Sequence, residues 1–144
     1  MNKLWIIALA VLVAAGAWWL SGGLPETAQV PESAPAPGSA LAEVALPASF
    51  SEPAVIGKRI FDAKCAACHN ENAAGQEGVA PPLVHVIYEP SHHADEAFQR
   101  AVAMGVRGHH WPFGNMPPVE GLTRGDVQMV VAYVRELQRA NGIN

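Results

Sequence analysis

Apolar residues recur at helical spacing along the last part of the chain. Thr123 and Asp126 form a pattern typical of a capping box, which starts a helix, and Gly142 is a typical helix end. Between them the apolar side chains are spaced by three or four positions: Val127, Val130, Val134 and Leu137. The pattern predicts an amphipathic helix that packs one face on a core.

Two further helices are predicted upstream. Ser51 followed by Pro53 is typical of a helix start, and this helix runs into Cys65. Another helix is predicted over residues 94–104, with Gly105 as its stop. No run alternates apolar and polar residues well enough to predict a strand, and the long connecting stretches are rich in Gly and Pro. We therefore expect an all-α fold of three or more helices, whose loops wrap around a bulky group absent from the sequence.

An apolar segment near the N-terminus, from Leu4 to Leu20, holds no charged or polar side chain. Its length fits either a short membrane-spanning helix or the core of a signal peptide. Cleavage after Ala17 would leave Trp18 and Trp19 as an exposed apolar tip, whereas tryptophans commonly anchor spanning helices at the interface. We favour an uncleaved membrane anchor over residues 1–20, with a cleaved signal as the alternative.

The rest of the chain divides by composition and by charge. Lys3 has no basic successor until Lys58, so the positive-inside rule places the chain after the helix on the periplasmic side of a bacterial cytoplasmic membrane. Residues 21–49 are rich in Pro, Ala, Ser and Gly and hold no aromatic residue. This composition predicts a flexible tether, with a protein-binding Pro motif as the minority interpretation. Residues 50–144 remain for one small domain.

Composition excludes several classes of protein. Nine Lys and Arg against 13 Asp and Glu give a net charge of -4 without a basic cluster, so nucleic acid is not an expected partner. Two cysteines are too few for a disulfide framework or a four-thiolate metal site. The two cysteines are therefore expected to act together.

Both cysteines belong to the sequence Cys65-Ala66-Ala67-Cys68-His69, which is the C-x-x-C-H signature of covalent c-type haem attachment. Two thiols one helical turn apart can add to the two vinyl groups of one haem, and the next residue can offer its imidazole to the iron. The alternatives are a thioredoxin-type thiol pair, which usually follows a strand, and half of a zinc site, which needs further ligands. One covalent haem c is the favoured interpretation.

At these residues, residues 50–144 resemble a class I c-type cytochrome. In that family a glycine and an aromatic residue of the first helix cross an aromatic residue of the last helix, and Gly57, Phe61 and Tyr133 match them. The family's Gly-Pro-x-Leu element is here Ala80-Pro81-Pro82-Leu83, in which alanine replaces the glycine. The resemblance implies that the Pro81 carbonyl accepts a hydrogen bond from His69, which orients the imidazole.

The resemblance also implies a second axial ligand, a methionine in a Met-Pro element before the last helix. Met116 in Gly114-Asn115-Met116-Pro117-Pro118 matches this element. The metal ligands are thus expected to be His69 and Met116. Met104 and Met129 are interpreted as packing residues, and His110 is the alternative ligand in the same loop.

Histidines, an arginine and a tryptophan lie shortly before Met116 in the sequence. Arg107, His110 and Trp111 are candidates for hydrogen bonds to the haem propionates. Adjacent histidines do not readily point at one metal ion, so we interpret the remaining loop histidines as exposed to solvent. These residues are His85, His92, His93 and His109.

The ligand set implies a function. A haem with both axial positions filled passes one electron but does not readily bind oxygen, peroxide or a substrate, so an electron carrier rather than an enzyme is expected. An anchor at residues 4–20 would keep this carrier near redox proteins in or at the membrane, within a respiratory or photosynthetic chain, as a monomer or as a subunit of a complex. A haem sensor or subunit, and a small haem enzyme with an open sixth position, remain alternatives.

Overall fold

The computed structural model describes residues 36–144. The predicted membrane helix over residues 1–20 and the first part of the predicted tether lie outside this range. Among the residues it does describe, no helix is both long enough and apolar enough to span a membrane.

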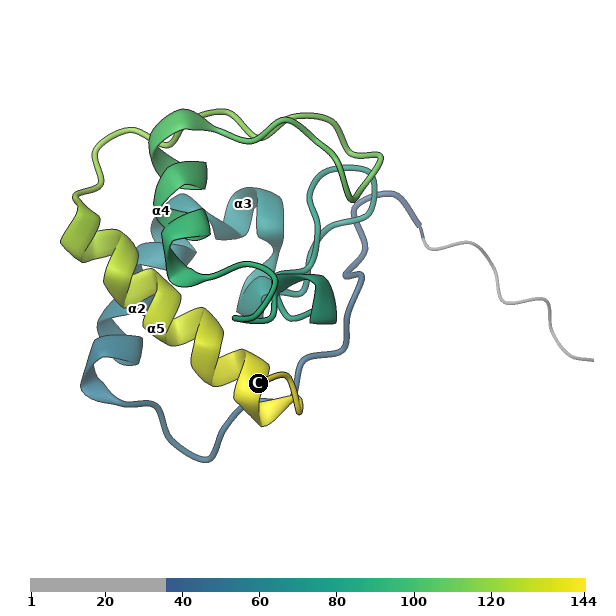
Figure 1. The fold of residues 1–144 in the computed structure, drawn as a ribbon. Coiled ribbons are helices and arrows are strands. Elements are labelled where there is room, and N and C mark those ends of the chain that lie inside the picture. Colours follow the sequence, from purple (N-terminus) through teal and green to yellow (C-terminus); the bar gives the residue numbers. More distant parts are fainter. Residues whose placement is uncertain (1–35) are drawn as a thin grey trace, which may run out of the picture. The chain divides into compact units, whose positions relative to one another are not determined.

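The described part of the chain is all-helical (Figure 1). It contains four α-helices and two short 3-10 helices, and the pairing of backbone segments is limited to isolated bridges. The α-helices are α2 (Glu52–Lys64), α3 (Ala66–His69), α4 (Asp95–Met104) and α5 (Arg124–Ala140), and the 3-10 helices are η1 (Glu71–Ala73) and η2 (Val86–Tyr88). The expectation of a small all-α fold with long loops is confirmed.

The helix ends form as the sequence predicts. Ser51 is the N-cap of α2, and its hydroxyl accepts a hydrogen bond from the Ala54 amide. Thr123 caps α5 in a capping box, in which its hydroxyl accepts from the Asp126 amide and the Asp126 carboxylate accepts from the Thr123 amide. Helix α4 ends at Gly105, whose φ of +75° suits a glycine. These local signals fix the boundaries to within one or two residues.

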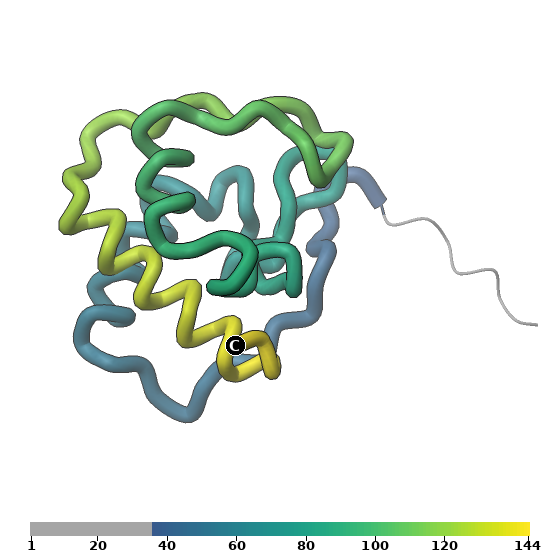
Figure 2. Tube along the Cα trace, viewed as in Figure 1, coloured from purple at the N-terminus to yellow at the C-terminus, as the bar shows by residue number. Residues whose placement is uncertain are grey.

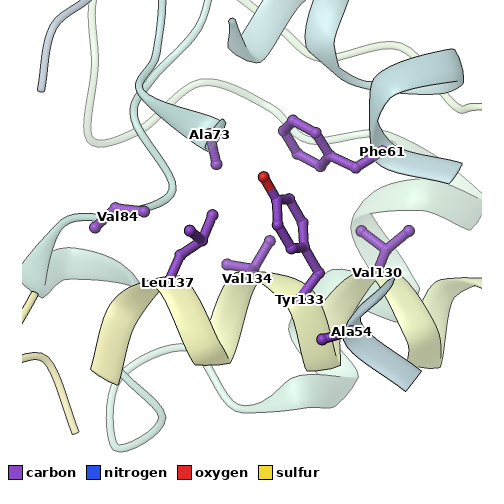
Figure 3. Packing of buried hydrophobic residues seen from close by; sticks show 8 residues of the cluster. All are labelled: Ala54, Phe61, Ala73, Val84, Val130, Tyr133, Val134 and Leu137. Carbon is purple, nitrogen blue, oxygen red and sulfur yellow. The ribbon is translucent and has the colours of Figure 1, made fainter. Parts of the chain in front are cut away.

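Helices α2 and α5 cross in close contact and form the centre of the core (Figures 1 and 3). Gly57 lies at the crossing, because a Cβ atom there would stand 1.9 Å from the Met129 carbonyl oxygen. Phe61 and Tyr133 are fully buried beside it, with ring centroids 5.6 Å apart. Phe50 packs on the other side of Tyr133 at 5.3 Å. The crossing expected from the family resemblance is confirmed.

The compact unit begins before the predicted boundary at residue 50. It includes all of the described residues, 36–144, and Figure 2 shows the segment that leads into α2 running along the domain. The Leu41 and Ala42 amides donate to the Ala74 carbonyl, and Ala45 exchanges two hydrogen bonds of 2.9 Å with the Asn141 side chain. Residues 36–49 are therefore held by backbone hydrogen bonds rather than forming a flexible tether, a correction to the predicted boundary.

A buried arginine ties α5 to the segment before α4. The guanidinium of Arg135, whose side chain is 9% exposed, donates to the Asp95 carboxylate at 2.9 Å. It also donates to the carbonyl oxygens of Tyr88 and His93 at 2.7 and 2.5 Å and to the Gln138 side chain at 2.7 Å. A planar guanidinium can serve several acceptors at once, so this residue fixes the irregular chain between η2 and α4.

Candidate haem site

The two cysteines lie where helix α2 ends and α3 begins. Cys65 is the C-cap of α2, and its amide donates to the Phe61 carbonyl at 2.8 Å. Cys65 is half-buried and Cys68 is exposed, and both thiols are free. Burial, together with the neighbouring Cys68, raises the pKa of the Cys65 thiol to about 11. A raised thiol pKa is the opposite of the lowered pKa that activates a thiol of the thioredoxin type.

His69 closes α3 and is buried and oriented. Its Nδ1 atom donates to the Pro81 carbonyl oxygen at 2.9 Å, which is the hydrogen bond that the resemblance implies. Burial lowers the pKa of His69, although the hydrogen bond to Pro81 acts in the opposite direction. The imidazole is therefore neutral at pH 7, and because Nδ1 carries the proton, Nε2 has a free lone pair. This state is the one that ligates a metal ion.

A close approach of two loops places Pro81 beside His69. The Gly75 amide donates to the His69 carbonyl at 2.8 Å, and Gly75 has a φ of +75°. A Cβ atom at this position would lie 2.3 Å from the Pro82 nitrogen and 2.8 Å from the Pro81 carbonyl carbon. Only glycine allows this approach without a shift of the backbone, so Gly75 sets the position of the Pro81 carbonyl. Sequence reasoning did not identify this residue.

Met116 lies at the base of a loop that is closed by hydrogen bonds. Its amide and carbonyl each pair with Val106 at 2.9 Å, and the Gly108 amide donates to the Asn115 side chain at 2.9 Å. These bonds fix the backbone of Met116 independently of its side chain, which is half-buried. A thioether held at a rigid loop base is suited to serve as a ligand.

The indole of Trp111 has a buried donor. Its Nε1 atom lies near the Tyr88 side chain without a hydrogen bond of good geometry, while its ring stacks on Phe113 and meets His85 edge-on. A buried N–H without an acceptor is uncommon, and a haem propionate is an acceptor of the required kind. Arg107 is exposed, and its carbonyl accepts from His109. Trp111 therefore remains the stronger candidate of the two as a donor to a haem propionate.

Two sequence interpretations of individual residues need correction. Met104, interpreted as a packing residue, is 67% exposed at the last position of α4. The loop histidines His92, His109 and His110 are exposed as expected, whereas His85 and His93 are half-buried. The potential ligand atoms of three histidines converge: His92, His93 and His110. The sequence distance between the two pairs concealed this cluster.

The two thiols of Cys65 and Cys68 and the oriented imidazole of His69 form the arrangement that a covalently attached haem requires. A family model for cytochrome c matches residues 54–138, and the chain belongs to the cytochrome c family. A comparison with curated proteins finds no match to this chain. The cofactor is therefore haem c, attached through Cys65 and Cys68, and members of this family generally transfer electrons rather than catalyse reactions.

Proposed function

We propose that this protein is a one-electron carrier whose haem iron has His69 and Met116 as its axial ligands. The observation that carries the proposal is the hydrogen bond from His69 Nδ1 to the Pro81 carbonyl, since it leaves Nε2 free in a buried, neutral imidazole. The two backbone hydrogen bonds between Met116 and Val106, which hold the Met116 loop closed, support the second ligand. Haem, when bound, supplies an iron that takes up and releases one electron.

The protein's own residues set how readily this electron moves. The Pro81 carbonyl keeps the His69 ring in one orientation, so the ligand does not rearrange between oxidation states. A methionine thioether favours ferrous iron, which gives a reduction potential on the positive side of zero. Two protein ligands leave no open position for a substrate, which favours a carrier over an enzyme.

The substitution Met116→Ala tests the ligand assignment. We expect it to remove the far-red charge-transfer band of the oxidised protein, to lower the reduction potential by about 100 mV or more, and to let carbon monoxide bind the reduced protein. The backbone hydrogen bonds to Val106 do not involve the side chain, so the loop is expected to keep its fold. Absorption spectra and a redox titration measure these changes.

Met104→Leu is the matched control, because Met104 is 67% exposed and lies outside the loop of Met116. It should leave the band, the potential and the exclusion of carbon monoxide unchanged. The assignment is wrong if Met116→Ala retains the band while His110→Ala or Met104→Leu loses it. If the parent protein binds carbon monoxide readily, the sixth position is open and a sensor or an enzyme explains the protein better.

We also propose that residues 4–20 anchor the protein in a bacterial cytoplasmic membrane, with the haem domain in the periplasm. The support is the apolar composition of that segment and the position of Lys3 before it. Confinement near the membrane raises the effective concentration seen by membrane-bound redox partners. The proposal predicts that an alkaline carbonate wash leaves the protein in the membrane fraction, whereas full release would indicate a cleaved signal.

A further inference from the structure

Four histidines from two distant segments meet in one cluster. His92 and His93 lie in the turn before α4, and His109 and His110 lie at the tip of the loop that follows it. The ring of His110 lies 5.4 Å from that of His92 and 5.3 Å from that of His93, measured between centroids. One ligand atom each of His92, His93 and His110 lies within 4.8 Å of the other two.

The side chains of the adjacent residues His92 and His93 can approach the same point because their backbone forms a turn rather than a helix. The His92 and His93 amides both donate to the Glu89 carbonyl, at 3.1 and 2.8 Å, and the two rings stand 4.8 Å apart at 67°. The guanidinium of Arg135 holds the His93 carbonyl. This geometry overrides the expectation that neighbouring histidines cannot serve one metal ion.

His93 is oriented as a metal ligand. Its Nδ1 lies 2.6 Å from the Ile87 carbonyl oxygen, and because a carbonyl only accepts, Nδ1 carries the proton. The Nε2 atom then keeps its lone pair. Metal-binding histidines commonly donate their other nitrogen to a backbone carbonyl in this way, which fixes the tautomer and the ring orientation.

The backbone of the loop that carries His110 is also held in place. Val106 and Met116 pair at the base of the loop, and His109 Nδ1 bonds to the Arg107 carbonyl at 2.8 Å, so His110 stands on a closed tip. Within residues 36–144, none of the clustered histidines forms an ion pair with a carboxylate. No carboxylate therefore competes with a metal ion for these imidazoles within the described residues.

We propose that His92, His93 and His110 bind one transition-metal ion of the kind that prefers imidazole, Zn²⁺ or Cu²⁺. Ligand nitrogens of a tetrahedral zinc ion lie about 3.4 Å apart, which small rotations of the exposed His92 and His110 side chains can reach from the observed separation. Three imidazoles do not suit Mg²⁺ or Ca²⁺, which take oxygen ligands. Water completes the coordination, as in zinc sites with three protein ligands.

A bound ion would join the turn before α4 to the loop that carries Met116. Because the ion binds the folded chain, it stabilises the native state in proportion to its concentration and affinity. The metal site uses none of Cys65, Cys68, His69 and Met116, and it rests on the proposed ligation of the iron by Met116, which leaves His110 free.

Titration calorimetry of the untagged, chelator-treated haem protein with Zn²⁺ tests the site. We expect one zinc ion per chain, and a loss of affinity of at least about tenfold in His93→Ala and in His110→Ala. His85→Asn is the matched control, since asparagine can still accept the hydrogen bond from the Ile87 amide, and it should bind zinc as the parent does. An unchanged far-ultraviolet circular dichroism spectrum verifies that each variant is folded.

X-ray absorption at the zinc edge counts the ligands without interference from iron. Three imidazoles in the parent and two in His110→Ala support the assignment. The proposal is overturned if the parent binds no zinc, or if zinc binds equally well to folded His93→Ala and His110→Ala.

Discussion

The crossing of α2 and α5 makes Gly57→Ala a sharp test of the packing. A Cβ atom at residue 57 would lie 1.9 Å from the Met129 carbonyl oxygen, 2.4 Å from its carbonyl carbon and 3.0 Å from the Val130 nitrogen. Ordinary van der Waals contact begins at 3.4 Å, so the first of these distances falls short by about 1.5 Å. All three atoms belong to the backbone of α5, which cannot turn aside as a side chain can.

The expected magnitude is the difference between two effects. Alanine improves helix propensity over glycine by up to about 1 kcal/mol. Overpacking costs about 1–3 kcal/mol and sometimes more, and the upper end applies here because two helix backbones must separate. The net loss in the free energy of unfolding is therefore about 2 kcal/mol, which corresponds to a decrease in Tm of about 8 °C for a domain of this size.

Thermal denaturation followed by circular dichroism measures this loss. Gly125→Ala is the control on α5, because a Cβ atom there would meet only the Thr123 hydroxyl at an ordinary 3.6 Å. We expect its Tm to equal or exceed that of the parent. If Gly57→Ala is as stable as Gly125→Ala, the two helices do not cross as closely as described, and the argument for the core is refuted.

Two further predictions concern polar contacts. Arg135→Lys replaces a buried guanidinium by a single ammonium, which cannot reach the Asp95 carboxylate and the His93 carbonyl together. We therefore expect the free energy of unfolding, measured by urea denaturation, to fall by about 1–3 kcal/mol. An unchanged midpoint would contradict the role given to this residue. Hydrogen bonds from the Thr123 amide and hydroxyl hold the pKa of Asp126 below its usual range. The Asp126 carboxylate therefore stabilises the fold at pH values above the pKa of Asp126 in the unfolded chain. This contribution is lost as the pH falls through the pKa of Asp126 in the folded protein. Asp126→Asn should therefore be less stable than the parent at pH 7 but not at a pH below both pKa values, and a stability difference that does not change with pH would contradict the capping box.

Local signals explain why much of the fold could be predicted from the sequence. The cap at Ser51, the capping box at Thr123 and the stop at Gly105 act within one turn of chain, so they indicate helix ends without tertiary information. The motif from Cys65 to His69 is equally local, and the spacing of its cysteines and histidine is enough to indicate covalent haem attachment.

The features that the sequence did not reveal depend on contacts between distant segments. Residues 36–49 have the composition of a tether, but the carbonyl of Ala74 and the side chain of Asn141 supply the hydrogen bonds that fix them. Gly75 matters only because Pro82 lies against it. The convergence of His93 and His110 likewise needs the loop after α4 to fold back, which no pattern within either segment indicates.

The ligation of iron by Met116 is the central claim, and nuclear magnetic resonance of the reduced protein tests it most directly. The chain has four methionines, so labelling their methyl carbons with ¹³C gives few signals. We predict that one methyl resonance is shifted far upfield by the ring current of the haem, that Met116→Leu removes it, and that Met104→Leu keeps it. A reduced protein without such a resonance, or one that retains it in Met116→Leu, would contradict the assignment.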